Sequence, residues 1–234
     1  MCVTPSVRTD VRTGARSAAD PVPVLADSVL RVSEPVTEST LRRRQNTRAR
    51  LIAAAEDVFT AKGLRRVTVD DLVGAAGFSR GAFYSNFSSI EEVFYALFRA
   101  QSEHMLDTVR SLLDETPDEE FSIGFLLARL RPLSRSWYVI QTEFTLLALR
   151  NEEARVVFRE HRADFEDQMV AVIADVLDRL GRVPEVPIKQ LTESSIALYL
   201  HALCQEGLGM DTLDVDELTG TVLPQLLLAL SREK

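Results

Sequence analysis

Residues 68–87 read TVDDLVGAAGFSRGAFYSNF and predict two short helices joined by a tight turn. Thr68 is a favourable N-cap for the first helix, and Gly77 suits the left-handed conformation that ends it. Ser79 is placed to cap the second helix, in which Phe83 and Phe87 are four residues apart and face inward. The positions turned outward are Arg80, Gly81, Tyr84, Ser85 and Asn86. This arrangement is typical of a helix-turn-helix, although similar turns occur in proteins that never bind DNA.

Further helices are predicted on either side of this pair. Residues 47–62 carry apolar side chains at helical spacing, with the basic segment LRRRQNTRAR at residues 41–50 at their start. After the pair, Ser89 and Glu92 form a capping pair for a long helix from Ile90 to about Asp114. The three helices before this long helix predict a small domain over residues 41–89.

Together these residues support a family resemblance. The segment RARLIAAAEDVFTAKGLRRVTVDDLVGAAGFSRGAFYSNFSSIEEVF, about a fifth of the chain, resembles the DNA-binding domain of the tetracycline-repressor-like (TetR) bacterial regulators. The resemblance implies that DNA phosphates are contacted by Thr68, Ser79, Tyr84 and Asn86. It also implies that Arg80 and Gly81 lie nearest the base edges. The chemistry agrees, because hydroxyl and amide groups bind phosphate, whereas arginine binds guanine O6 and N7 together.

One position departs from the family pattern. The family usually has a lysine that contacts the DNA backbone at the start of the fourth helix, whereas this chain has Ile90. The arginines of residues 41–50, Arg44 and Arg48 among them, are expected to contact the groove or the phosphates instead. The alternative is that this charged run is a solvated tail.

The charge distribution favours DNA binding more than the total charge does. The chain carries a net charge of −8, which alone argues against a nucleic-acid ligand. Residues 41–99 nevertheless hold 10 Lys and Arg against 6 Asp and Glu, whereas residues 100–234 hold 13 against 24. DNA binding is therefore expected from a small basic head, and the acidic body should limit indiscriminate binding.

The rest of the chain predicts helices only, so the fold class is all-α. The periodicity and the Ala, Leu, Glu and Arg content favour helix, and breaks are expected at Pro132, at residues 181–187 and at residues 207–209. We therefore expect three regions. Residues 1–40 are read as a disordered arm, residues 41–89 as the helix-turn-helix domain, and residues 90–234 as a larger ligand-binding and dimerisation domain.

Two late helices indicate a homodimer. Residues 188–206 are apolar or small on most faces, and a final helix from about Asp214 to Ser231 carries a leucine-rich stripe, with Pro224 expected to kink it. They resemble the pair of helices that joins two subunits in the TetR family, the alternative being that both are ordinary core helices. A dimer would place two reading helices roughly 34 to 36 Å apart on a near-palindromic operator.

The body also carries aromatic side chains suited to a pocket, and the family resemblance implies a small-molecule site there. The candidate ligand-binding residues are Phe121, Phe125, Trp137, Tyr138, Gln141, Phe144, His161 and Phe165. Each aromatic residue could equally belong to the core, because helical spacing alone does not distinguish the two.

Other classes of function receive little support from the sequence. The three histidines are isolated, and there is no phosphate-binding glycine loop or nucleophile motif, so we expect no enzyme activity, cofactor or metal. No apolar run is long enough to span a membrane. Cys2 and Cys204 fit a reducing compartment, and a cytoplasmic location is expected.

These observations predict a homodimeric repressor that binds a DNA operator and is released by a small-molecule effector. One alternative is a DNA-binding dimer of the same fold that responds to a protein partner. Another is a helical small-molecule-binding protein that no longer reads DNA, for which Ile90 is the supporting observation.

Overall fold

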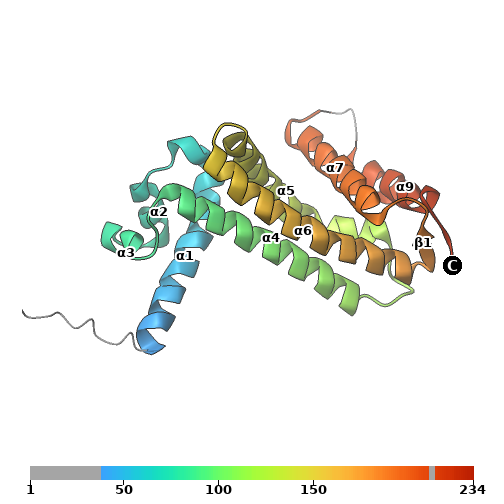
Figure 1. The fold of residues 1–234 in the computed structure, drawn as a ribbon, viewed down its shortest axis with the longest axis horizontal. Helices are drawn as coiled ribbons and strands as arrows, with labels where there is room; N and C mark the ends of the chain where they lie inside the picture. The colour runs from blue at the N-terminus through green and yellow to red at the C-terminus, as the bar shows by residue number, and fades with distance from the viewer. Residues whose placement is uncertain (1–37, 211–213) are drawn as a thin grey trace, which may run out of the picture. The chain divides into compact units, whose positions relative to one another are not determined.

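The computed structural model describes residues 38–210 and 214–234, and almost all of its regular structure is helical, which confirms the all-α prediction (Figure 1). The first part of the chain forms α1 (Glu38–Lys62), a 3-10 turn (Leu64–Arg66), α2 (Val69–Ala76), α3 (Arg80–Tyr84) and α4 (Ile90–Glu115). The remainder forms α5 (Ile123–Ala148), α6 (Glu152–Arg179), β1 (Arg182–Pro184), α7 (Ile188–Gly207), α8 (Val215–Glu217), a π-helical turn (Leu218–Val222), α9 (Leu223–Ala229) and β2 (Ser231–Glu233).

Helices α1 to α3 form the head, with α2 packed on α1 and α3 packed on α2. Five large side chains at its centre are almost fully buried: Leu51, Phe59, Leu72, Phe83 and Phe87. The turn between α2 and α3 has the predicted geometry, because Gly77 lies in the left-handed region with φ 70°. The predicted caps are also present, since the side chains of Thr68 and Ser79 accept hydrogen bonds from the amides of Asp71 and Ala82.

Helix α1 is longer than the sequence pattern predicts. It begins at Glu38 rather than at Thr47, so the basic segment is helical throughout. Residues 41–46 are all exposed, and a helix turn without a buried face leaves no apolar periodicity to detect. The expected arm of residues 1–40 lies outside the described residues, except for residues 38–40, which belong to α1.

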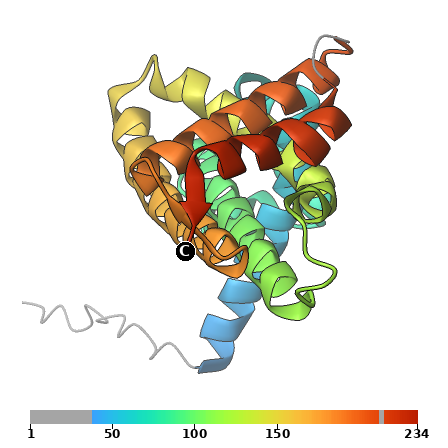
Figure 2. The ribbon, with the colours of Figure 1, turned by 90° about the vertical axis from the view of Figure 1, so that its right-hand side faces the viewer.

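The body is built on α4, α5 and α6, which pack against one another, and α7 packs on α5 and α6. Helices α7 and α9 lie side by side on one face of this group (Figure 2). The expected break at Pro132 is wrong, because α5 runs through it. Pro132 and Ala128 are both exposed, so the Ala128 carbonyl that proline leaves without an amide partner faces solvent.

The C-terminal segment is less regular than the single kinked helix that the sequence predicts. A π-helical turn precedes Pro224, and the Leu223 amide donates to the carbonyl of Leu218, five residues earlier. This wider turn accommodates the missing proline amide inside a continuous helical path. Two short antiparallel strands, β1 and β2, were not predicted; they pair Val183 with Arg232 and tie the end of the chain to the end of α6.

One apolar core runs through the head and the body. Helix α4 contacts α1 in the head as well as α5 and α6 in the body, and its residues Val93, Phe94, Leu97 and Phe98 are buried. A displacement of α4 must therefore be felt in both parts. None of the helices in the described ranges is long and apolar enough to cross a membrane.

Candidate nucleic-acid interface and ligand cavity

One face of α3, together with its N-cap Ser79, lies on the surface of the head. Ser79, Arg80, Gly81 and Tyr84 are all exposed, and the Tyr84 side chain has a fractional exposure of 62%. A tyrosine so exposed leaves both its ring and its hydroxyl accessible to a partner. Phe83, with no exposed surface, fixes the helix to the core from the opposite side.

Glycine at position 81 is not required by the head itself. A side chain built there would meet only the Ser79 hydroxyl, at 3.7 Å, which is an ordinary contact distance. Because Gly81 has no side chain, the backbone of α3 is accessible at this point, as expected where a backbone approaches another molecule closely.

Arg80 is held by Asp70 of α2. Its Nε donates to Asp70 Oδ1 at 2.5 Å, and its Nη2 donates to Asp70 Oδ2, so the two planar groups form a bidentate pair. These hydrogen bonds lower the pKa of Asp70 below its ordinary value and raise the pKa of Arg80. Both side chains are largely exposed, and the pair therefore stands at the position from which Arg80 is expected to read bases.

The structure places Asn86 differently from its predicted position. Its fractional exposure is 8%, and its amide nitrogen donates to the Ala82 carbonyl at 2.8 Å and to the Ser85 hydroxyl at 3.2 Å. Both amide hydrogens are thus used within the head. Ser85 is exposed, but its hydroxyl donates to the same Ala82 carbonyl. The outward orientation expected for Asn86 is therefore wrong, because it closes the C-terminal end of α3.

Thr68 likewise has its hydroxyl proton engaged. The hydroxyl accepts from the Asp71 amide and donates to Asp71 Oδ2 at 2.9 Å. Asp71 also accepts from Lys62 Nζ at 2.6 Å, and this hydrogen bond, followed by those from Thr68, lowers the pKa of Asp71 to about 2. Thr68 and Asp71 form a complete capping box, which makes Thr68 a structural residue of α2 in this state.

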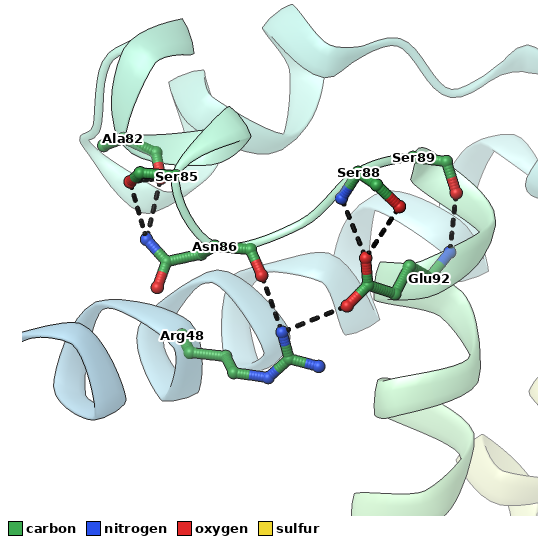
Figure 3. A network of polar contacts seen from close by, with 7 residues as sticks. All are labelled: Arg48, Ala82, Ser85, Asn86, Ser88, Ser89 and Glu92. Atoms are coloured by element: carbon green, nitrogen blue, oxygen red, sulfur yellow. Dashed lines mark hydrogen bonds and ion pairs between the residues drawn. The ribbon is translucent and has the colours of Figure 1, made fainter. Parts of the chain in front are cut away.

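Arg48 is half-buried, and its guanidinium points toward the segment between α3 and α4 (Figure 3). Its Nη1 donates to the Asn86 carbonyl at 2.7 Å and pairs with Glu92 Oε1 at 3.3 Å. The guanidinium also lies over the Phe87 ring, 4.0 Å from its centroid. Arg48 thereby connects α1 to the segment between α3 and α4.

Arg50, two residues further along α1, also contacts an aromatic ring and a backbone carbonyl of the head. Its guanidinium lies 4.7 Å from the centroid of Phe78 and donates to the Ala76 carbonyl at the end of α2. Arg44, by contrast, is exposed on the first turns of α1. Within residues 41–50, Arg48 and Arg50 thus contact other parts of the head, and Arg44 is exposed on the first turns of α1.

The start of α4 is capped as predicted, with one difference. The Ser89 hydroxyl accepts from the Glu92 amide at 3.1 Å, but the Glu92 carboxylate accepts from the amide and the hydroxyl of Ser88 (Figure 3). These hydrogen bonds lower the pKa of Glu92. Ile90 is half-buried and packs against the core, so it contributes to the attachment of α4 instead of facing a phosphate.

A cavity of about 110 Å³ lies between α4, α5, α6, α7 and α9. Of the predicted ligand-binding residues it is lined by Trp137 and Phe165, whose rings stack with centroids 5.1 Å apart. Gln141 lines an adjacent cavity of about 60 Å³ together with the same two rings. These three residues are the part of the predicted set that the fold brings together.

The other predicted ligand-binding residues lie elsewhere. Phe144 is fully buried between Phe94, Phe98 and Phe158, and belongs to the core. Two other rings make cation–π contacts with arginines: Arg179 lies over Phe121, and Arg129 lies over Phe125. The remaining positions are Tyr138, half-buried on α5, and His161 on α6.

His161 lines a separate, more polar cavity, and its Nε2 lies 3.2 Å from Arg99 Nη2. Burial, and then the charge of Arg99, lower its pKa, which favours the neutral imidazole.

Most of the cavity wall was missed because it is aliphatic. The residues that the sequence did not single out include Met105, Val109, Ile123, Leu126, Leu130, Ile173, Val176, Ser195, Ile196, Tyr199, Leu223 and Leu227. Leucine and isoleucine at helical spacing fit a filled core as well as they fit a cavity, so no signal in the sequence separates the two.

Comparisons with known proteins agree with this architecture. A family model described as bacterial regulatory proteins, tetR family, matches residues 51–97. The uncharacterized HTH-type transcriptional regulator YfiR of Bacillus subtilis (strain 168) is 30% identical over 169 residues, covering 69% of this chain and 79% of YfiR.

Two solved structures share the fold. A TetR-family transcriptional regulator from Cytophaga hutchinsonii superposes with a TM-score of 0.63 at 18% identity, covering 82% of this chain and 98% of that one. FadR from Bacillus subtilis, in complex with stearoyl-CoA, superposes with a TM-score of 0.58 at 15% identity, covering 76% and 97%.

The family match covers α2, α3, the second half of α1 and the start of α4, and the similarity to YfiR extends over more than two thirds of both chains. YfiR is described as a transcriptional regulator, in agreement with the expectation that the chain is not an enzyme. The chain therefore belongs to the tetR family of bacterial regulatory proteins and is a transcriptional regulator.

Proposed function

We propose that two copies of this chain bind a near-palindromic operator in double-stranded DNA and repress transcription until a small molecule releases them. The observation that carries the proposal is the exposed face of α3, where Ser79, Arg80 and Tyr84 stand together above the buried Phe83. The Arg80 guanidinium can bind guanine, and the Ser79 and Tyr84 hydroxyls can donate hydrogen bonds to phosphate oxygens. Gly81 allows the backbone between them to approach the duplex.

The proposed division of labour follows the charge. Residues 41–89 read DNA, with Arg44 on the exposed start of α1 as a further phosphate contact. Residues 90–234 bind the effector and the second subunit. A regulator that must reach the chromosome of a bacterium works in the cytoplasm.

The second subunit is proposed to pack on α7 and α9. Helix α7 exposes small side chains at Ser194 and Ala197, and α9 exposes Leu228, with a fractional exposure of 36%. Small residues let two helices approach closely, and an apolar neighbour supplies buried area. Leu228→Arg should therefore yield monomers in light scattering, whereas Val156→Arg, on exposed α6, should leave the dimer intact.

Effector release is proposed to work through α4. A ligand that prefers one position of α5, α6 and α7 shifts α4, and with it the separation of the two heads. A coupling free energy of about 1 to 3 kcal/mol suffices for a useful switch. Trp137 is the only tryptophan of the chain and lines the cavity, so its fluorescence reports binding directly. A protein that responds to a partner protein instead would show no such signal.

Selection of genomic DNA fragments on the purified protein at physiological salt tests the proposal. The control is the double variant Arg80→Ala, Tyr84→Ala, whose positions are exposed and whose fold should be unaffected. We expect a near-palindrome from the wild type alone. Equal recovery by wild type and variant would mean that α3 does not read DNA, and would favour a binding protein without operator specificity.

A further inference from the structure

The cavity between α4, α5, α6, α7 and α9 has an almost wholly apolar wall. Leucine, isoleucine, valine, methionine and aromatic side chains form it, and none of the described residues that line it is charged. A water molecule needs roughly 10 to 15 Å³ of such space together with two to four polar partners. At about 110 Å³ the cavity has far more room than that and few partners, so it favours an apolar molecule over water.

Two of the polar groups in the wall are already satisfied by the protein. The Trp137 indole nitrogen donates to the Ser102 hydroxyl at 3.0 Å, and the Ser195 hydroxyl donates to the Leu191 carbonyl at 2.8 Å. A ligand gains nothing from either hydrogen.

Two other hydroxyls in the wall are not satisfied in this way. Ser134 on α5 has a fractional exposure of 2%, and its hydroxyl donates to the sulfur of Met105, a weak acceptor, at 3.9 Å. It also lies beside the Tyr199 hydroxyl: burial raises the pKa of Tyr199, and the interaction with Ser134 offsets part of that rise. The Tyr199 hydroxyl on α7 is buried without a hydrogen bond of ordinary geometry among the described residues. A buried hydroxyl without a strong partner is costly, so these two groups favour a ligand that offers one.

We propose that this cavity binds an uncharged, mainly hydrocarbon molecule with a single hydroxyl or carbonyl group, which Ser134 and Tyr199 recognise. This inference rests on the proposed function, because it names the class of effector that the regulator senses. The cavity excludes a carboxylate or an ammonium group, since a buried charge is tolerated only beside a partner of opposite charge.

The neighbouring cavity does not supply such a partner for an anion. Its guanidinium, Arg162, is already paired with Glu166 at 2.6 Å, and Glu193 adds a second carboxylate. The two carboxylates and one guanidinium leave a net negative charge at this place, so a carboxylate head would meet repulsion.

Binding of 1-octanol, octanoate and octylammonium to the full chain, followed by Trp137 fluorescence without DNA, tests the inference. At pH 7.5 we expect saturable binding of 1-octanol, at least about tenfold tighter than either ion. Octanoate should bind only as its neutral acid, so its apparent affinity should rise about tenfold for each pH unit lowered towards its own pKa.

Three variants locate the bound molecule. Tyr199→Phe should weaken octanol binding about fivefold to tenfold through loss of one hydrogen bond, whereas Tyr95→Phe, which stacks on Phe144 outside the cavity, should not. Ile173→Phe should abolish binding by filling the space.

The proposal is overturned if octanoate binds as tightly as octanol without pH dependence, if none of the probes binds saturably, or if Tyr199→Phe has no effect. Operator affinity measured with and without octanol separates this inference from the proposed function. Octanol binding that leaves operator affinity unchanged would contradict the regulatory role and leave the cavity assignment standing.

Discussion

Among single residues, Asp70 is expected to govern how Arg80 meets DNA in the proposed complex. The bidentate pair must open, or turn as a unit, before the guanidinium can bind a guanine, and the carboxylate itself repels phosphate. Asp70→Asn should therefore raise the affinity for the operator by up to about fivefold, because an exposed ion pair is weak. The measurement is fluorescence anisotropy on operator DNA. Asp57→Asn removes the same charge from the exposed surface of α1 and should have a smaller effect on operator affinity. If the two variants have equal effects, Asp70 acts only through the net charge of the head and not through Arg80.

Asp71 gives the head a defined response to acid. Its folded-state pKa of about 2 lies below its ordinary value of 3.8, so it stabilises the fold at higher pH and the stabilisation is lost as the pH falls from about 4 to about 2. The difference in urea midpoint between the wild type and Asp71→Asn should be constant above pH 5 and shrink over that range. A difference that does not change with pH would show that the carboxylate charge is not what matters in the capping box.

For the individual elements, capping residues predict helix boundaries better than composition does. Thr68, Ser79 and Ser89 each begin a helix where the sequence places it, because a side-chain oxygen and an apolar stripe specify the same position. The start of α1 has neither a predicted capping side chain nor an apolar stripe. Pro132 predicts a helix end where α5 in fact continues. An interior proline removes one amide and crowds the carbonyl four residues earlier. A helix tolerates this more easily where that carbonyl can bind water, and the sequence alone does not show which side of the helix faces solvent.

For the same reason, the exposed face of α3 can be predicted from the sequence, whereas the cavity wall cannot. The face of α3 follows from two phenylalanines four residues apart, which is local information. Whether Phe144 lines a cavity or fills the core depends on Phe94 and Phe98 of α4 and Phe158 of α6, which come from elsewhere in the chain. The DNA contacts expected of Asn86 and Arg48 stay predictions. Both side chains nevertheless make hydrogen bonds within the head, which a polar residue beside a helix-turn-helix does not reveal in the sequence.

The attachment of α1 to the segment between α3 and α4 depends on Arg48. Its hydrogen bond to the Asn86 carbonyl, its ion pair with Glu92 and its position over Phe87 all join separate elements. Arg48→Ala should lower the free energy of unfolding by about 1 to 3 kcal/mol, and Arg48→Lys should recover only part of it, because a lysine cannot donate and stack at once. Arg44→Ala should leave stability unchanged while weakening DNA binding. If Arg48→Ala is as stable as the wild type, Arg48 acts on DNA instead.

For the whole molecule, the question is how the effect of a ligand, proposed to bind in the body, would be transmitted to the head. Aromatic rings form a continuous series from the cavity wall to α1, with centroid separations between 5.1 and 6.2 Å: Phe165, Trp137, Phe98, Phe144, Phe94 and Phe59. Rings packed this closely cannot move independently. Since α4 contributes two of them and also contacts α1, a repacking around Trp137 is transmitted most directly through α4.

Phe98 is the ring at which this coupling should be interrupted, because it contacts Trp137 on the cavity side and Phe144 on the head side. Phe98→Leu keeps an apolar side chain but removes both ring contacts. We expect a variant that still binds operator and still quenches Trp137 with ligand, but whose ratio of operator affinities with and without ligand moves towards one. Phe121→Leu, whose ring packs on Arg179 outside the series, should keep the wild-type ratio. An unchanged ratio in Phe98→Leu would exclude this path and leave a shift of the whole of α4, or of the dimer contact, to carry the signal.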